Sequence, residues 1–170
     1  MRKLLLLLGG ILACSLWPVS QGSAQTPEKI GENHAWVAYT YKEDGNTVCF
    51  MASAPEKMEG KYTRRDDPFA LVTHHPAKGV SGEASLVAGY IYRKDSDVTV
   101  TIGERNFSLV PENDRAWTSG TEDDARLVKA MIGGIRMTVV GYSTRGTKTT
   151  DTYSLKGFTA TKKLIDQACK

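Results

Sequence analysis

The sequence has no apolar run after residue 24 that is long enough to cross a membrane. It also lacks an excess of charge, because 20 basic residues face 19 acidic ones from residue 25 onward, which leaves a net charge of +1. This near balance gives no indication of nucleic-acid binding or of a polybasic membrane patch. Glycine-rich phosphate-binding loops, dinucleotide fingerprints, internal repeats and low-complexity segments are also absent.

Histidine is scarce as well, with three residues in the chain, of which only His74 and His75 are adjacent. Neighbouring residues on a strand point to opposite faces, so these two cannot easily bind one metal ion. Pro76 follows them and ends the strand. We therefore expect no metal and no cofactor, and we expect His74 to pack at a strand end with a hydrogen-bond partner for its ring.

Residues 1–24 are typical of a secretory signal peptide. Arg2 and Lys3 precede a short apolar segment, and small residues lie just before Gln25. The chain is therefore expected to be periplasmic or secreted. A second interpretation stays open, because the residues around Cys14 loosely resemble a lipobox, and lipidation there would anchor the protein in a membrane.

Cysteine occurs three times in the chain, and only Cys49 and Cys169 follow the leader. Export removes the chain from the reducing cytosol, so these two thiols are expected to form a disulfide. The bridge would close a loop of 120 residues, and the chain-entropy model gives it up to ~5 kcal/mol. Two unpaired buried thiols are the alternative.

Apolar and polar residues alternate with period two over most of the chain, which is typical of half-buried strands. Glu43-Asp44-Gly45-Asn46 predicts a tight hairpin between two of them. Helical spacing of apolar residues predicts two short helices, at about 121–132 and 161–169. We therefore expect a mainly β fold, an antiparallel β-sandwich or barrel. It would form a single domain over residues 35–170, preceded by a flexible segment at 25–34.

Three residues are candidates for a binding surface: His74, Arg145 and Asp151. Arg145 and Asp151 flank a glycine-containing turn, where they could pair across a hairpin. The mixed-charge run at 64–67 is expected to be a solvated loop with local ion pairs.

No catalytic residue is assigned. Residues 141–145 nearly match a nucleophile elbow around Ser143, but Arg145 replaces the second glycine and a strand pattern follows. The enzymatic alternative is a periplasmic hydrolase that uses His74 with Asp66 or Asp67 and Ser143 as the nucleophile.

Four segments of the chain resemble the invasion-associated locus B family: residues 48–53, 69–74, 127–131 and 145–158. The resemblance covers nearly the whole chain after the leader, and the last segment is its most specific part. It implies a small exported alphaproteobacterial protein with no enzymatic activity and no cofactor. The family takes its name from a locus linked to the entry of pathogens into host red cells.

Together these observations predict a non-enzymatic periplasmic or cell-envelope protein that binds another protein or a small ligand and acts in host-cell interaction or envelope integrity. Its partner would be an envelope or host protein that the sequence does not identify. A periplasmic hydrolase and a lipid-anchored structural envelope protein are the two alternatives.

Overall fold

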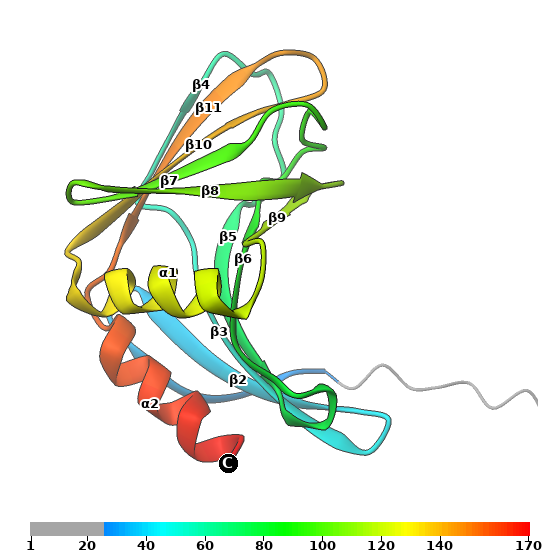
Figure 1. Cartoon of the computed structure of the whole chain (residues 1–170), viewed down its shortest axis with the longest axis vertical. Coiled ribbons are helices and arrows are strands. Elements are labelled where there is room, and N and C mark those ends of the chain that lie inside the picture. The colour runs from blue at the N-terminus through cyan, green and yellow to red at the C-terminus, as the bar shows by residue number, and fades with distance from the viewer. Residues whose placement is uncertain (1–25) are drawn as a thin grey trace, which may run out of the picture.

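The computed structural model describes residues 26–170, so the expected signal peptide and Cys14 lie outside the described residues. Eleven strands and two α-helices make up most of this part of the chain (Figure 1). The strands are β1 Glu28–Asn33, β2 Trp36–Glu43, β3 Asn46–Ser53, β4 Lys57–Gly60, β5 Phe69–His75, β6 Val80–Val87, β7 Val98–Ile102, β8 Arg105–Glu112, β9 Arg115–Trp117, β10 Arg136–Tyr142 and β11 Lys148–Ser154. The helices are α1 Thr121–Gly133 and α2 Phe158–Ala168, with a 3-10 turn at Pro76–Lys78.

All strands belong to one antiparallel sheet with the order β1-β2-β3-β5-β6-β9-β8-β7-β10-β11-β4. The sheet is open, because β1 forms one edge and β4 the other. It is strongly bent, and both helices lie on its concave side (Figure 1). The expected mainly β fold with two short helices is confirmed, and the open, bent sheet is sandwich-like and not a closed barrel.

The predicted hairpin between β2 and β3 forms around Asp44 and Gly45, both of which have positive φ angles, 50° and 81°. An aspartate followed by a glycine tolerates this conformation at low cost, so the two residues set the register of the pair. That register places Cys49 opposite Thr40 on one side and His74 on the other.

The N-terminal segment differs from the prediction of a flexible stretch at 25–34. Glu28–Asn33 form β1, which pairs with β2 and carries an irregularity between Lys29 and Gly31. A Cβ at Gly31 would lie 2.5 Å from Leu164 Cδ1, so α2 packs directly on this strand. The segment lacks clear alternation, and pairing with β2 rather than its own pattern orders it.

The second helix begins at Phe158, three residues before the predicted start at 161. Gly157 precedes it with a left-handed φ of 89°, and Phe158 is fully buried against Trp36 in an edge-to-face contact. Burial of this aromatic pair extends the helix beyond the region that helical spacing indicated.

The first helix matches the predicted range, and one acidic residue of its first turn contacts the sheet. Gly120 is the N-cap and forms no side-chain cap. Asp124 is buried instead, and its carboxylate accepts hydrogen bonds from the Ala84 N–H at 2.8 Å and the Thr118 hydroxyl at 2.7 Å. The helix is therefore fixed to β6 by a side chain.

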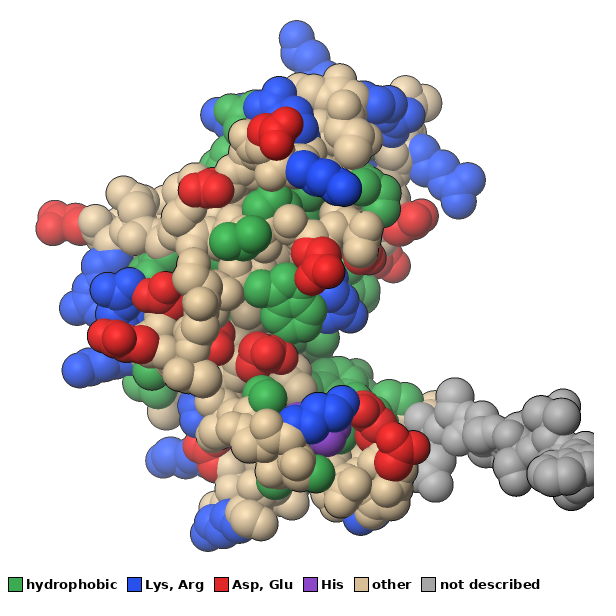
Figure 2. Space-filling view, turned by 45° about the vertical axis from the view of Figure 1, so that its right-hand side comes forward, with side chains coloured by type: hydrophobic (Ala, Val, Ile, Leu, Met, Phe, Trp, Pro, Cys, Tyr) green, Lys and Arg blue, Asp and Glu red, His purple; other side chains and the backbone are tan. Residues whose placement is uncertain are grey.

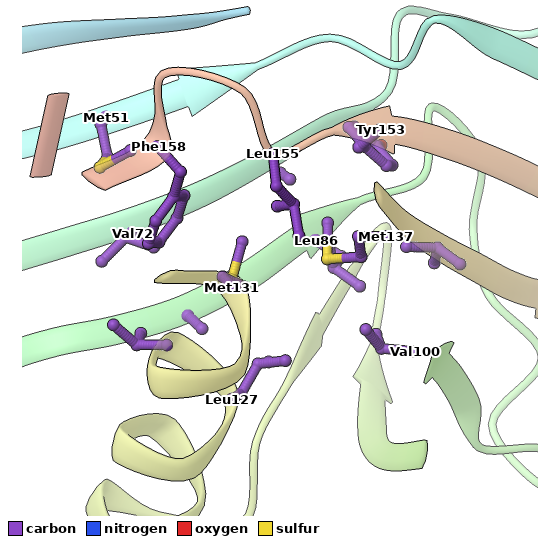
Figure 3. Close-up of a cluster of buried hydrophobic side chains, with 14 of the residues drawn as sticks. Met51, Val72, Leu86, Val100, Leu127, Met131, Met137, Tyr153, Leu155 and Phe158 are labelled. Carbon is purple, nitrogen blue, oxygen red and sulfur yellow. The ribbon is translucent and has the colours of Figure 1, made fainter. Parts of the chain in front are cut away.

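The hydrophobic core lies between the helices and both halves of the bent sheet (Figure 3). Leu127 and Met131 of α1 approach Leu86 from one half of the sheet and Met137 from the other (Figure 3). The helix therefore stabilises the bend by burying apolar surface from both halves at once.

Cys49 and Cys169 form the expected disulfide, with 6.0 Å between their Cα atoms. Cys49 lies in the middle of β3, and Cys169 follows the last residue of α2. The bond therefore attaches the end of the chain to the sheet.

We predict that Cys169→Ala lowers the free energy of unfolding by about 3–5 kcal/mol, because the unfolded chain regains the freedom of a long loop. Urea denaturation followed by circular dichroism measures the change. Wild-type protein unfolded in the presence of a reductant serves as the control and should show the same loss. An unchanged midpoint in both samples would contradict a stabilising bridge.

Candidate functional site

Asp151 lies on β11, and its side chain is only 5% exposed. Both of its oxygens accept hydrogen bonds from the two terminal nitrogens of Arg65, each at 2.6 Å. Arg65 also donates from Nε to the Ala88 carbonyl at 2.6 Å, and its guanidinium lies 5.1 Å from the centre of the Tyr90 ring. The arrangement satisfies a buried charge with a planar, bidentate partner.

This pair corrects two of the expectations. Asp151 does not pair with Arg145, which is exposed in the turn after β10. Arg65 belongs to the run expected to be solvated, yet its side chain is 3% exposed. The spacing of β11 could have indicated this pairing. Asp151 shares the inward face of the strand with Thr149 and Tyr153, and a buried carboxylate needs a cation.

His74 is the penultimate residue of β5, opposite Cys49 of the disulfide, and its side chain is 7% exposed. Its Nδ1 accepts the Gly82 N–H at 2.9 Å, so the proton on the neutral ring lies on Nε2, which donates to Asp166 at 2.8 Å. Lys162 donates to the same carboxylate at 2.7 Å. His74 thus packs at the strand end with partners on both nitrogens.

The carboxylate of Asp166 balances opposing influences on its pKa. Partial burial raises the pKa, but hydrogen bonds from Lys162 and His74 outweigh burial and hold the pKa below its usual value. The ionised form therefore stabilises the contact between α2 and the end of β5.

The three groups of the hydrolase hypothesis have separate partners. The Ser143 hydroxyl accepts the Thr147 N–H at 3.1 Å, and the Asp66 carboxylate is 82% exposed with Arg64 4.0 Å away. Near His74 the available hydroxyl is that of Ser81, 3.4 Å from Nδ1. The in-plane lone pair of Nδ1 already accepts the Gly82 N–H, which leaves no free base to activate this hydroxyl.

His75 points away from His74, as neighbouring strand residues should. Its Nε2 lies 3.3 Å from Glu43 Oε1, which also accepts from Lys78 at 2.6 Å. Within residues 26–170 no group of three or more His, Cys, Asp or Glu side chains is placed to hold a metal ion. In the same range, no helix combines the length and apolar character that a membrane span requires.

Two hollows adjoin the space between β8 and α1. One, of about 630 Å³, is lined by the residues of both elements and the loop between β9 and α1: Arg105, Asn106, Phe107, Ser108, Thr118, Ser119, Asp123, Arg126 and Lys129. A second, of about 800 Å³, continues from it around the β7–β8 turn and shares Arg105 and Lys129. We call the first hollow the β8–α1 groove.

The β8–α1 groove carries an excess of positive charge. Three cations line it against one acid, and that acid, Asp123, is paired with Arg126. Basic and acidic side chains meet on the left-hand side of the surface in Figure 2, at the height of α1 in Figure 1. The sequence analysis missed this site, because its cations come from separate elements that no linear motif connects.

We predict that Asp151→Asn lowers the free energy of unfolding by about 3–5 kcal/mol, because it leaves the Arg65 guanidinium buried without a counter-charge. The double variant Arg65→Met, Asp151→Leu should regain most of this loss. Arg64→Met is the matched control, since its side chain is 91% exposed and the change should stay within about 0.5 kcal/mol. Urea denaturation measures all three, and an Asp151→Asn protein as stable as the wild type would contradict the assignment.

The depressed pKa of Asp166 predicts a pH dependence. Its ionisation stabilises the fold above the unfolded-state pKa of about 3.9, and the contribution is lost as the pH falls through the folded-state pKa. Asp166→Asn should therefore cost less than about 1 kcal/mol at pH 7, since solvent reaches the carboxylate, and nothing in strong acid. Thermal unfolding across this range, with exposed Asp95→Asn as the control, checks it. A difference that persists unchanged in acid would count against the ionic contact.

No curated protein and no solved structure matches the chain. The family model described as invasion associated locus B (IalB) protein matches residues 36–166, which is most of the chain and includes His74, the buried Arg65–Asp151 pair and the β8–α1 groove. The chain therefore belongs to the invasion-associated locus B family.

Proposed function

We propose that this protein is a non-enzymatic periplasmic or cell-envelope protein that binds a partner protein through the β8–α1 groove. The basic and apolar leader at residues 1–24 supports export. The Cys49–Cys169 disulfide supports an oxidising compartment. Membership of the family supports an association with the envelope.

The observation that carries a binding role is the groove itself. Its walls come from a strand and a helix that the core holds rigidly, since Leu109 of β8 and Leu127 of α1 are buried. Arg105, Lys129 and Asn106 are exposed on these walls. A rigid recess with exposed charge is suited to recognition of a partner with opposite charge.

The groove hypothesis is tested with a charge-reversal variant. Arg126→Glu with Lys129→Glu should reduce capture of envelope partners by a tagged mature protein at least tenfold, because two attractive contacts become repulsive. Lys163→Glu with Lys170→Glu, which reverses two exposed charges elsewhere, is the control and should leave capture unchanged. Quantitative mass spectrometry of proteins cross-linked in intact cells measures both.

The location is tested in the same cells. Osmotic shock should release a mature chain that begins at Gln25. A blocked, acylated Cys14 would establish the lipid-anchored alternative instead, and retention in the cytoplasm would contradict export. Equal capture by both double variants would contradict the groove as the binding surface.

A further inference from the structure

One stretch of β8 has a neighbour on only one side. From Arg105 to Leu109, β8 pairs with β7, whereas β9 pairs with β8 only from Val110 to Glu112. After Trp117 the chain leaves the sheet and enters α1. The sheet therefore forks beyond β9, and α1 passes through the fork (Figure 1).

The register shows which main-chain groups are unpaired along this stretch. Ile102 and Arg105 close a two-residue hairpin, so they exchange hydrogen bonds, and so do the pairs at Phe107 and Leu109. Asn106 and Ser108 alternate with them and direct their N–H and C=O groups away from β7, toward the groove. Val110 and Glu112 point the same way, and β9 satisfies them.

On the other arm of the fork, formed by β6, a side chain of α1 satisfies the equivalent main-chain group. β6 also extends beyond β9, because β9 pairs only with Ser85–Val87. There the Ala84 N–H, next along the ladder, is satisfied by the carboxylate of Asp124. The helix thus caps the β6 arm, while the β8 arm remains open beside Arg126 and Lys129.

We propose that an extended acidic peptide segment binds in the β8–α1 groove by adding a strand to the free edge of β8. Asn106 and Ser108 would supply main-chain hydrogen bonds, and their alternation fits a strand partner. Phe107, half-buried on the groove wall, offers an apolar contact. Five edge residues accommodate about 17 Å of extended peptide.

The charges select an acidic segment over a second copy of this chain. Asp123 forms an ion pair with Arg126. Arg105 and Lys129, which also line the groove, form no ion pair with any described residue. Asp97, which accepts the Ser108 hydroxyl, adds one negative charge at the far end of the edge. A second β8 edge would bring a groove of the same net positive charge, three cations against one acid, against this one, and such repulsion discourages self-pairing.

This inference rests on the proposed binding function and specifies its partner. The probe is a fluorescent, terminally blocked peptide of about eight residues that alternates glutamate and threonine. We expect saturable anisotropy binding to the mature, disulfide-bonded protein that weakens with salt. The same peptide with lysine in place of glutamate should bind at least tenfold more weakly.

Substitutions at one residue separate main-chain from side-chain recognition. Ser108→Pro removes an N–H that faces the groove without removing a hydrogen bond to β7, and Pro111 already occupies this strand. It should weaken binding at least tenfold, whereas Ser108→Ala, which keeps the N–H and removes only the hydroxyl, should weaken binding much less. A peptide N-methylated at alternate residues provides the same test on unaltered protein, so the result does not depend on the folding of the proline variant.

Several outcomes would overturn the inference. They are the absence of saturable binding, equal binding of the lysine peptide, equal binding of the N-methylated peptide, or a dimer of the wild type that Ser108→Pro dissolves. Partner capture in cells that survives in Ser108→Pro would overturn edge pairing and leave the proposed function standing. Peptide binding by a protein that fails to reach the envelope would support edge pairing and contradict the proposed function.

Discussion

The buried ion pair between Arg65 and Asp151 is the interaction on which the geometry of the sheet depends. Arg65 precedes β5 and contacts the carbonyl of Ala88 just after β6, whereas Asp151 lies on β11 in the other half of the sheet. One side chain therefore connects both halves where the sheet bends. Because each charge is desolvated, the two residues stabilise the fold only together, and the bend places α1 against both halves.

A second connection holds the C-terminal helix. The disulfide joins Cys169 to the middle of β3, and the hydrogen bond between His74 and Asp166 joins the same helix to β5, the next strand of the sheet. The histidine that looked most like a catalytic group is thus occupied on both ring nitrogens by structural partners. Its position beside Cys49 follows from the register of β3 and β5.

The open edge of β8 is a consequence of how α1 occupies the fork in the sheet. The helix approaches β6, where Asp124 satisfies the main chain, and its distance from β8 leaves the groove. Sheet edges are usually blunted, because unpaired strands invite association. Here the cations at the edge discourage a like-charged strand and favour an acidic one, so one set of side chains serves protection and selection.

The period-two pattern, the Asp44-Gly45 turn and the helical spacing determined a mainly β chain with two helices, because these are local properties of the backbone and of burial. The pair of cysteines determined the bridge, since no other cysteine follows residue 24. The ordering of β1, the early start of α2 at Phe158 and the partner of Asp151 were decided by tertiary structure. Each of them depends on residues far apart in the chain: Leu164 on Gly31, Trp36 on Phe158 and Arg65 on Asp151. The groove was also decided by tertiary structure, because the open edge of β8 exists only where β9 ends and α1 begins. The alternation within a single strand does not determine the order of strands in the sheet.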